Sequence, residues 1–243
     1  MCGRFTLTRK DFRALAAELE ATFDDSVESL YRARYNIAPT DEHWIVREKQ
    51  EQRQILPAKF GLVNSWAKDA KGAARQINAR SETALSRPAF REAFEKRRCA
   101  VPADGFFEWA GAKEARRPFW YHAPDGGLIL FAGLYESWRD PKTQDWLRSF
   151  TILTTAANAV VEPVHDRMPV ILQRERLDDW LHVPSRNAED YAEGLRKLLV
   201  PAAGDVLAAT EVSRRVNSVA NDDAACLEPA NDGQLAAEPP RLF

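Results

Sequence analysis

The sequence is poor in cysteine and lacks any long apolar run. Its three cysteines stand at positions 2, 99 and 226 of 243 residues. Their number is odd and no two form a CxxC pair, which argues against a disulfide framework and against a zinc knuckle. No segment approaches the roughly 20 apolar residues that span a bilayer, and the amino-terminal residues lack the apolar core of a secretory signal. We therefore expect a cytoplasmic protein without a membrane partner.

The chain also lacks a large charge of either sign. Lys and Arg together number 34 against 36 Asp and Glu, which gives a net charge of -2. Such a balance produces no overall attraction to nucleic acid, so any site for an anion must be local. The four histidines include no pair at convincing metal-ligand spacing, and we expect neither a metal nor another cofactor.

Length and composition favour one globular domain. Apolar residues make up 45% of the chain and aromatic residues 10%, enough for a sizeable core. Internal repeats, low-complexity tracts and long linkers are missing from the sequence. We expect a single domain over residues 1–220, an irregular tail over residues 221–243, and a monomer.

The apolar periodicity predicts an α+β fold. Residues 10–23 place apolar side chains on one stripe at helical spacing, which predicts an amphipathic helix. Other segments read as strands arranged in hairpins, one of them turning at residues 125–127. We expect a mixed, mainly antiparallel sheet or an irregular barrel with peripheral helices, and this pattern does not determine the topology. The strand-like segments are 43–63, 97–110, 118–138, 149–155, 168–173 and 206–219, and the further helical segments are 86–94, 174–182 and 188–200.

Cys2 directly follows the initiator Met1. Removal of Met1, which is usual before a small residue, would leave an α-amine and a thiol on one residue. The α-amine has an ordinary pKa of about 7.7 to 8.0, so far more of it is unprotonated at neutral pH than of a lysine amine. An aldehyde that condenses with this amine forms an imine, which the neighbouring thiol closes into a five-membered thiazolidine.

Two other interpretations use the same residue. As a small apolar residue, Cys2 can simply begin the first strand. The position of Cys2 alone supports this structural role about as well as a chemical one. Glutamine amidotransferases of the N-terminal-nucleophile type also begin with Cys-Gly after methionine removal, and their α-amine serves as a base for the thiol.

Two polar stretches carry further candidate groups. The segment RQINARSET places Asn78 and Arg80 two residues apart, which could hold a carbonyl and a phosphate, although the pattern alone favours a turn with an exposed salt bridge. The segment VEPVHDRMP combines His165 and Arg167, a pairing suited to proton transfer and phosphate binding. His43, His122 and His182 lack such company and are expected to be structural.

Aromatic residues surround the third candidate. Glu108 follows Phe106 and Phe107 and precedes Trp109. Burial among these rings would raise the pKa of Glu108 and suit it to proton transfer near neutrality, whereas an outward-facing strand residue would keep its ordinary pKa. The pattern leaves these two alternatives equal. Trp66 and Trp109 can stack on unpaired bases, although core packing is the commoner use of tryptophan.

Five motifs in order resemble the SOS response-associated peptidase (SRAP) family over nearly the whole chain. They are MCGRF at the start, YNIAPT at 35–40, INARSET at 77–83, RRCAVPADGFFEW at 97–109 and HDRMPVIL at 165–172, and VNSVANDD near 217 is similar to the closing motif. The resemblance implies an α+β domain with a barrel-like sheet and a sensor of abasic sites in single-stranded DNA. Its amino-terminal cysteine forms a thiazolidine crosslink with the ring-opened sugar.

The resemblance also implies roles for individual residues. Cys2 is the crosslinking nucleophile, Asn78 positions the sugar or the amine, Glu108 is an acid/base group and His165 assists ring opening and reversal. Phosphate and base contacts are expected from Arg4, Trp66, Arg80, Trp109 and Arg167. The resemblance also implies a peptidase activity that removes Met1 autocatalytically, and the sequence leaves removal by an aminopeptidase open as the alternative.

The implied partner is single-stranded DNA with abasic sites, including sites at junctions with duplex, and the protein would join the nucleoid when bound. The sequence departs from the family's WGLVPxW pattern at Phe60 and Asn64, where loss of the proline predicts an altered DNA-facing loop. Two other functions remain open: an N-terminal-nucleophile amidotransferase and a non-covalent single-strand binding module.

Overall fold

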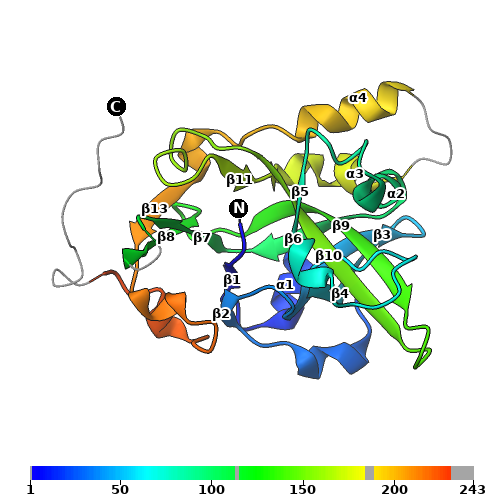
Figure 1. Ribbon diagram of the computed structural model, residues 1–243, viewed down its shortest axis with the longest axis horizontal. Helices are drawn as coiled ribbons and strands as arrows, with labels where there is room; N and C mark the ends of the chain where they lie inside the picture. Colours follow the sequence, from blue (N-terminus) through cyan, green and yellow to red (C-terminus); the bar gives the residue numbers. More distant parts are fainter. Residues whose placement is uncertain (1, 113–114, 184–188, 231–243) are drawn as a thin grey trace.

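The computed structural model describes residues 2–112, 115–183 and 189–230, and its strands form two sheets (Figure 1). The strands are β1 Phe5–Leu7, β2 Arg34–Ile37, β3 Glu42–Lys49, β4 Gln52–Phe60, β5 Asn78–Arg80, β6 Arg98–Ala103, β7 Gly105–Ala110, β8 Arg117–His122, β9 Ile129–Arg139, β10 Trp146–Ala156, β11 Arg167–Pro169, β12 Ile171–Leu172 and β13 Ala208–Glu211. The α-helices are α1 Phe12–Glu18, α2 Pro88–Lys96, α3 Leu177–Leu181 and α4 Glu189–Leu198.

Five strands close into a barrel. Its order is β10-β4-β3-β6-β9, and β9 pairs with β10 to complete the ring. All neighbours in the ring are antiparallel except β4 and β10, which run parallel. Strand β5 is a parallel addition to β10, and β11 and β12 extend the sheet further. The predicted α+β, mainly antiparallel, barrel-like fold is confirmed.

A second sheet packs against the barrel. Its order is β13-β8-β7-β1-β2. Phe5 of β1 meets Phe60 and Phe131 of the barrel edge to face, with ring centroids 5.4 Å and 6.0 Å away. Phe106 of β7 also contacts Phe131 at 6.0 Å. These fully buried rings join the two sheets into one core.

One predicted hairpin is real and another is wrong. Segment 43–63 forms the β3–β4 hairpin as expected. Segment 118–138 does turn after Asp125, where Gly126 has a φ of +70°, but β8 and β9 do not pair with each other. Strand β8 joins the second sheet and β9 joins the barrel, because each finds its hydrogen-bonding partners elsewhere.

The first helix is shorter than its apolar stripe predicts. It begins at the Asp11 cap, whose side chain accepts the backbone N–H of Ala14, and ends at Glu18 rather than at residue 23. Glu20 has a φ of 51°, which breaks the helix, and Thr22 then forms a bridge to Gln54 of β4. Helix α2 has Pro88 in its first turn, as segment 86–94 predicts.

Asp104 fixes the point where the chain leaves the barrel for the second sheet. This buried carboxylate accepts hydrogen bonds from the hydroxyl of Thr6 and from both the backbone N–H and the hydroxyl of Thr8, the latter two at 2.6 Å. Segment 97–110 is therefore two strands, β6 and β7, that belong to different sheets. The same contacts hold the end of β1 in place beside β7.

Residues 221–230 lie against the second sheet. They include a short 3-10 helix over Ala224–Cys226, and Val212 forms a bridge with Pro229. Residues 231–243 fall outside the described residues, so most of the expected tail does too. In the part of the chain that the structure describes, no helix is long and apolar enough to cross a membrane.

Replacing Gly105 with alanine should destabilise the fold by about 1–3 kcal/mol, because a Cβ there would stand 2.1 Å from the indole nitrogen of Trp120 and 2.8 Å from the Tyr121 carbonyl oxygen. Gly72→Ala is the matched control, since Gly72 has a helical φ of -77° and open space around its Cβ position. Urea unfolding measures both variants. Equal stability of the two would contradict the packing of Trp120 on Gly105.

Candidate active site

The pairing of β1 with β7 determines where Cys2 lies. Phe5 stands opposite Phe106, and the N–H of Phe107 donates to the carbonyl oxygen of Arg4 at 3.0 Å. This antiparallel course carries the residues before Arg4 along β7 towards Glu108. Figure 1 shows the start of the chain rising from β1 past β7. Cys2 is fully buried at this place and belongs to the main core.

Glu108 is the acidic group beside Cys2. Its side chain is buried, with a relative exposure of 4%. Burial raises the pKa of Glu108 to about 7. The pKa of the Cys2 thiol is also raised, mainly by burial and to a smaller extent by the charge of Glu108. A carboxyl group with this pKa can both accept and donate a proton at neutral pH. The buried alternative for Glu108 is therefore the one that the fold adopts.

Arg4, which directly precedes β1, and Trp109 of β7 form a framework next to Cys2 and Glu108. Arg4 donates to Asn36 Oδ1 at 2.6 Å and to the carbonyl oxygen of Val216 at 3.0 Å, and its guanidinium lies over the Trp109 ring at 5.6 Å. The indole N–H of Trp109 donates to Asn217 Oδ1 at 2.7 Å. Both predicted DNA-contacting residues are thus bound within the protein.

A carboxy-terminal segment, residues 214–226, supports this framework. The buried Asn36 amide donates to the carbonyl oxygens of Val216, Ser218 and Asn221 at 3.2, 3.0 and 2.7 Å. Asp222 in turn accepts from the backbone N–H of Asn36 at 2.9 Å. The motif-by-motif assignment missed Asn36 and Asn217, although both stand in motifs that carry the resemblance, YNIAPT and VNSVANDD.

The β5 residues and the His165 loop meet at β10. Arg80 stands opposite Thr154 in the β5–β10 register. The Thr154 carbonyl oxygen accepts from the Ser81 N–H at 2.9 Å and from Arg167 at 2.5 Å. Arg167 also binds both Glu82 carboxylate oxygens, at 2.6 and 2.9 Å. The ion pair of this segment thus joins Glu82 to Arg167, which lies outside the segment, and Arg80 is exposed.

His165 is held by its own loop. The N–H of Arg167 donates to Nδ1 at 2.9 Å, so the neutral imidazole carries its proton on Nε2. Burial lowers the pKa of His165, which keeps the ring neutral at physiological pH. The adjacent Asp166 also acts on Glu108, whose pKa it raises as a smaller effect than burial. This electrostatic coupling links the His165 loop to the Cys2–Glu108 pair.

Asn78 presents an amide without partners. It stands opposite Ile152 in the β5–β10 register, two residues before Arg80. Both its Nδ2 and Oδ1 are buried, and among the described residues neither makes a hydrogen bond. Because an unsatisfied buried amide is costly, such a side chain is suited to bind an incoming polar ligand.

Trp66 lies away from these groups. It is 68% exposed in the loop after β4, and the next residue, Ala67, accepts the Trp138 indole N–H at 2.7 Å. This contact places the loop at the hairpin end of β9 and β10, the opposite end of β10 from Thr154. Asn64, the departure from the family pattern, is buried and donates to the Ala89 carbonyl oxygen at 2.6 Å, which ties the loop to α2.

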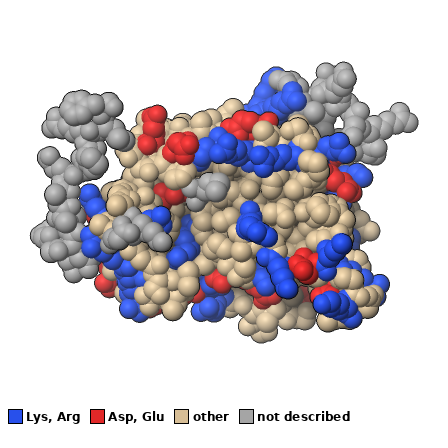
Figure 2. Space-filling model, in the orientation of Figure 1, with Lys and Arg blue, Asp and Glu red and all other residues tan. Residues whose placement is uncertain are grey.

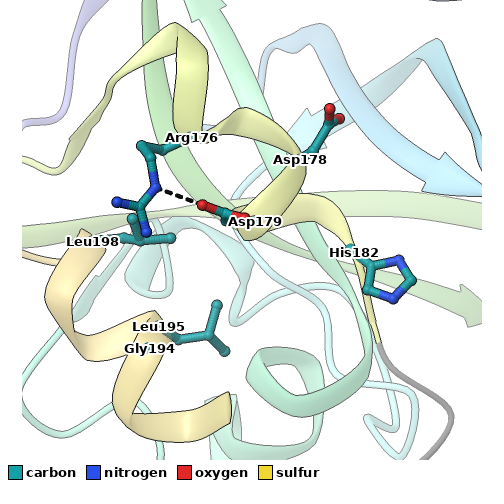
Figure 3. Close-up of a pocket in the computed structure, with 7 residues that line it drawn as sticks. All are labelled: Arg176, Asp178, Asp179, His182, Gly194, Leu195 and Leu198. Carbon is teal, nitrogen blue, oxygen red and sulfur yellow. Dashed lines mark hydrogen bonds and ion pairs between the residues drawn. The ribbon is translucent and has the colours of Figure 1, made fainter. Parts of the chain in front are cut away.

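The surface around the site is locally basic. Figure 2 shows Lys and Arg side chains in a band over the region that β5 and β11 occupy in Figure 1, despite the net charge of -2. A separate cavity of about 400 Å³ lies between α3 and α4 (Figure 3). Its Arg176 is paired with Asp179, and it contains none of the predicted site residues.

The raised pKa of Glu108 predicts a pH-dependent stability. Between about pH 4.5 and about pH 7, Glu108 keeps its proton in the folded protein but loses it in the unfolded chain. The free energy of unfolding therefore falls as the pH rises through this interval, by up to about 3 kcal/mol in total. Glu108→Gln lacks this titration. Urea unfolding across the interval should show wild type losing stability relative to Glu108→Gln. A difference that does not change with pH would contradict the buried carboxyl.

The amino-acid sequence matches the family model "SOS response associated peptidase (SRAP)" over residues 1–219. It is 35% identical to the abasic site processing protein YoqW of Bacillus subtilis, covering 94% of this chain and 99% of YoqW. It is 30% identical to the abasic site processing protein YedK of Escherichia coli, covering 94% and 100%. A crystal structure of a Bacteroides thetaiotaomicron protein shares the fold, with a TM-score of 0.81, 24% identity and coverage of 95% and 100%. The chain therefore belongs to the SRAP family.

Proposed function

We propose that this protein processes abasic sites in single-stranded DNA by a covalent crosslink through Cys2. The relatives YoqW and YedK carry the name abasic site processing protein, and the family match spans residues 1–219. The observation that carries the proposal is the burial of Cys2 beside Glu108, whose pKa is raised to about 7. A proton-transfer group thus stands next to the residue that would react.

The chemistry requires Met1 to be removed first, and self-processing at this bond is part of the proposal. The α-amine of Cys2 then adds to the aldehyde of the ring-opened sugar, and the resulting carbinolamine loses water to form an imine. The thiol adds to the imine carbon, forming the carbon–sulfur bond, and its proton passes to nitrogen. An imine acidifies the neighbouring carbon and promotes loss of the 3′ phosphate, so ring closure protects the strand from cleavage.

The electrostatics favour the amine as the first nucleophile. Burial raises the pKa of the Cys2 thiol above its ordinary value, so the sulfur is protonated at neutral pH and the amine adds first. In this proposal, Glu108 relays protons as the carbinolamine loses water and the ring closes.

Asn78 and His165 complete the proposed catalytic set. The unpartnered Asn78 amide would bind the opened sugar, which gives its buried donor and acceptor their missing partners. The neutral His165 imidazole would accept and return protons during ring opening and reversal. Asp166, coupled to Glu108, lies next to His165 and keeps the two titrating groups in one electrostatic system.

The proposed DNA contacts fall into two groups. Arg80 and Trp66 are exposed, which suits a phosphate contact and a stacking surface respectively. Arg4, Trp109 and Arg167 are held by internal partners, so a contact of theirs with DNA requires an exchange of those partners. Their role at the DNA remains a prediction, as does the monomeric state.

Intact mass spectrometry tests the covalent step. Mixed with an oligonucleotide that contains an abasic site, wild-type protein lacking Met1 should give an adduct equal to the sum of both masses minus one water. Cys2→Ala keeps an α-amine but no thiol, so it should give no stable adduct and only an imine that borohydride traps. Cys99→Ala, in β6 of the barrel, is the matched control and should crosslink normally.

Three results would contradict the proposal in different ways. A Cys2→Ala protein that crosslinks as stably as wild type would remove the thiol from the mechanism. Glutamine hydrolysis without a DNA adduct would favour the amidotransferase. DNA that binds but never survives denaturation would favour the non-covalent module.

Arg80→Ala should weaken DNA binding through loss of a phosphate contact. For a single strand, the slope of the logarithm of affinity against the logarithm of salt concentration should fall by about 0.7 per lost contact. Fluorescence anisotropy titrations across a salt series measure this. Arg13→Ala on α1 is the control, because Arg13 is paired with Glu28 at 2.6 Å. We expect its slope to equal that of wild type. An unaltered slope for Arg80→Ala would remove this residue from the interface.

A further inference from the structure

The barrel has a polar mouth at the end away from Thr154. His43, Ile45 and Arg47 alternate along β3, and the first two are buried in the core. Side chains two residues apart on a strand face the same way, so Arg47 points to the inner side of the barrel at its end. Arg148, Phe150 and Ile152 alternate along β10 in the same way, and Phe150 and Ile152 are buried in the core. Arg148 therefore also faces the inner side of the barrel at this end.

These arginines line a pocket of about 480 Å³. One wall is apolar, from Phe23, Val27, Leu56 and Pro57. Gln54, which stands opposite Arg47 in the β3–β4 register, accepts from Arg47 at 3.3 Å. Mouths of β-barrels with apolar walls and few convergent polar groups are common sites for small ligands, and this volume is within their usual range.

Among the described residues, the two guanidinium groups have no acidic partner. In the described part of the chain, neither Arg47 nor Arg148 has an acidic side chain at ion-pair distance, and the Nε atoms of both are buried without a hydrogen-bond partner. Burial, followed by the charge of Arg47, lowers the pKa of Arg148. Asp24 at the pocket uses its carboxylate to accept the Ser26 N–H at 2.9 Å. Two neighbouring cations in one pocket favour the entry of an anion.

We propose that this pocket binds a phosphate monoester through Arg47 and Arg148. A monoester carries a charge close to -2 at neutral pH, which matches the two guanidinium groups, whereas a carboxylate or a phosphodiester carries -1. Arginine is the side chain best suited to bind phosphate with paired N–H donors. The apolar wall, with Phe23 among its members, would hold the organic part of the ligand, and a nucleoside monophosphate fits this description.

The pocket is distinct from the Cys2 site. Arg148 precedes Thr154 by six residues on β10, a separation of about 20 Å along an extended strand. The proposal therefore does not depend on the crosslinking chemistry. The same terminal phosphate occurs on a free nucleotide and on the 5′ end of a DNA strand, and the two sources can be separated by experiment.

Isothermal titration calorimetry of the full chain tests the proposal with inorganic phosphate, dAMP, and a short oligonucleotide with either a 5′ phosphate or a 5′ hydroxyl. We expect saturable binding of dAMP, tighter than that of inorganic phosphate. Arg148→Gln and Arg47→Gln should each weaken it by about tenfold or more, as expected for loss of a charge-assisted contact. Arg139→Gln, in the same hairpin but outside the pocket lining, should change it less than about twofold.

Each outcome bears on the proposal. Tight binding of the 5′-phosphorylated oligonucleotide, lost in the 5′-hydroxyl form, would assign the site to DNA ends. Binding of dAMP alone would assign it to a free nucleotide. Absence of saturable binding for every phosphate at millimolar concentration, or binding that both arginine variants leave unchanged, would overturn the proposal. Crosslinking to abasic DNA should proceed normally in Arg148→Gln, which separates a failure here from a failure of the proposed function.

Discussion

The antiparallel pairing of β1 with β7 is the constraint on which the site depends. It brings the second residue of the chain to Glu108, more than a hundred positions later in the sequence. Both residues are buried there, so the charge of Glu108 acts through a low-dielectric environment, and the carboxyl titrates near neutrality rather than near its ordinary pKa. An exposed chain end would provide neither the fixed position nor the shifted proton affinity.

Several independent contacts hold this pairing in place. Asp104 fixes the end of β1 by bonds to Thr6 and Thr8. Arg4, on the other side, is bound to Asn36 and to the backbone of residue 216. Segment 214–226 thus acts on the reacting end of the chain through Arg4 and Trp109, although it carries none of the reacting groups. The segment is a structural support for the amino terminus.

Much of this architecture could be predicted from the sequence, because motif and periodicity are local signals. The β3–β4 hairpin, α2 with its Pro88, and the barrel-like antiparallel sheet follow from such signals. The allocation of β8 and β9 to different sheets does not, since a turn signal at Gly126 says nothing about the partners that each strand finds. Burial of Glu108 was likewise undecided, because the aromatic residues around it fit an inner or an outer face equally well. The Arg167–Glu82 pair joins residues 85 apart, a distance at which no local pattern operates.

The central claim is that the amine and the thiol of Cys2 both react with the sugar. It is tested most directly by peptide mapping of the nuclease-digested adduct after treatment with a thiol-alkylating reagent. The account predicts that the sugar remnant lies on the peptide that begins with Cys2, and that this sulfur resists alkylation because it is part of the thiazolidine. A remnant attached to a lysine, or a Cys2 that carries the sugar on nitrogen while its thiol is still alkylated, would contradict the account.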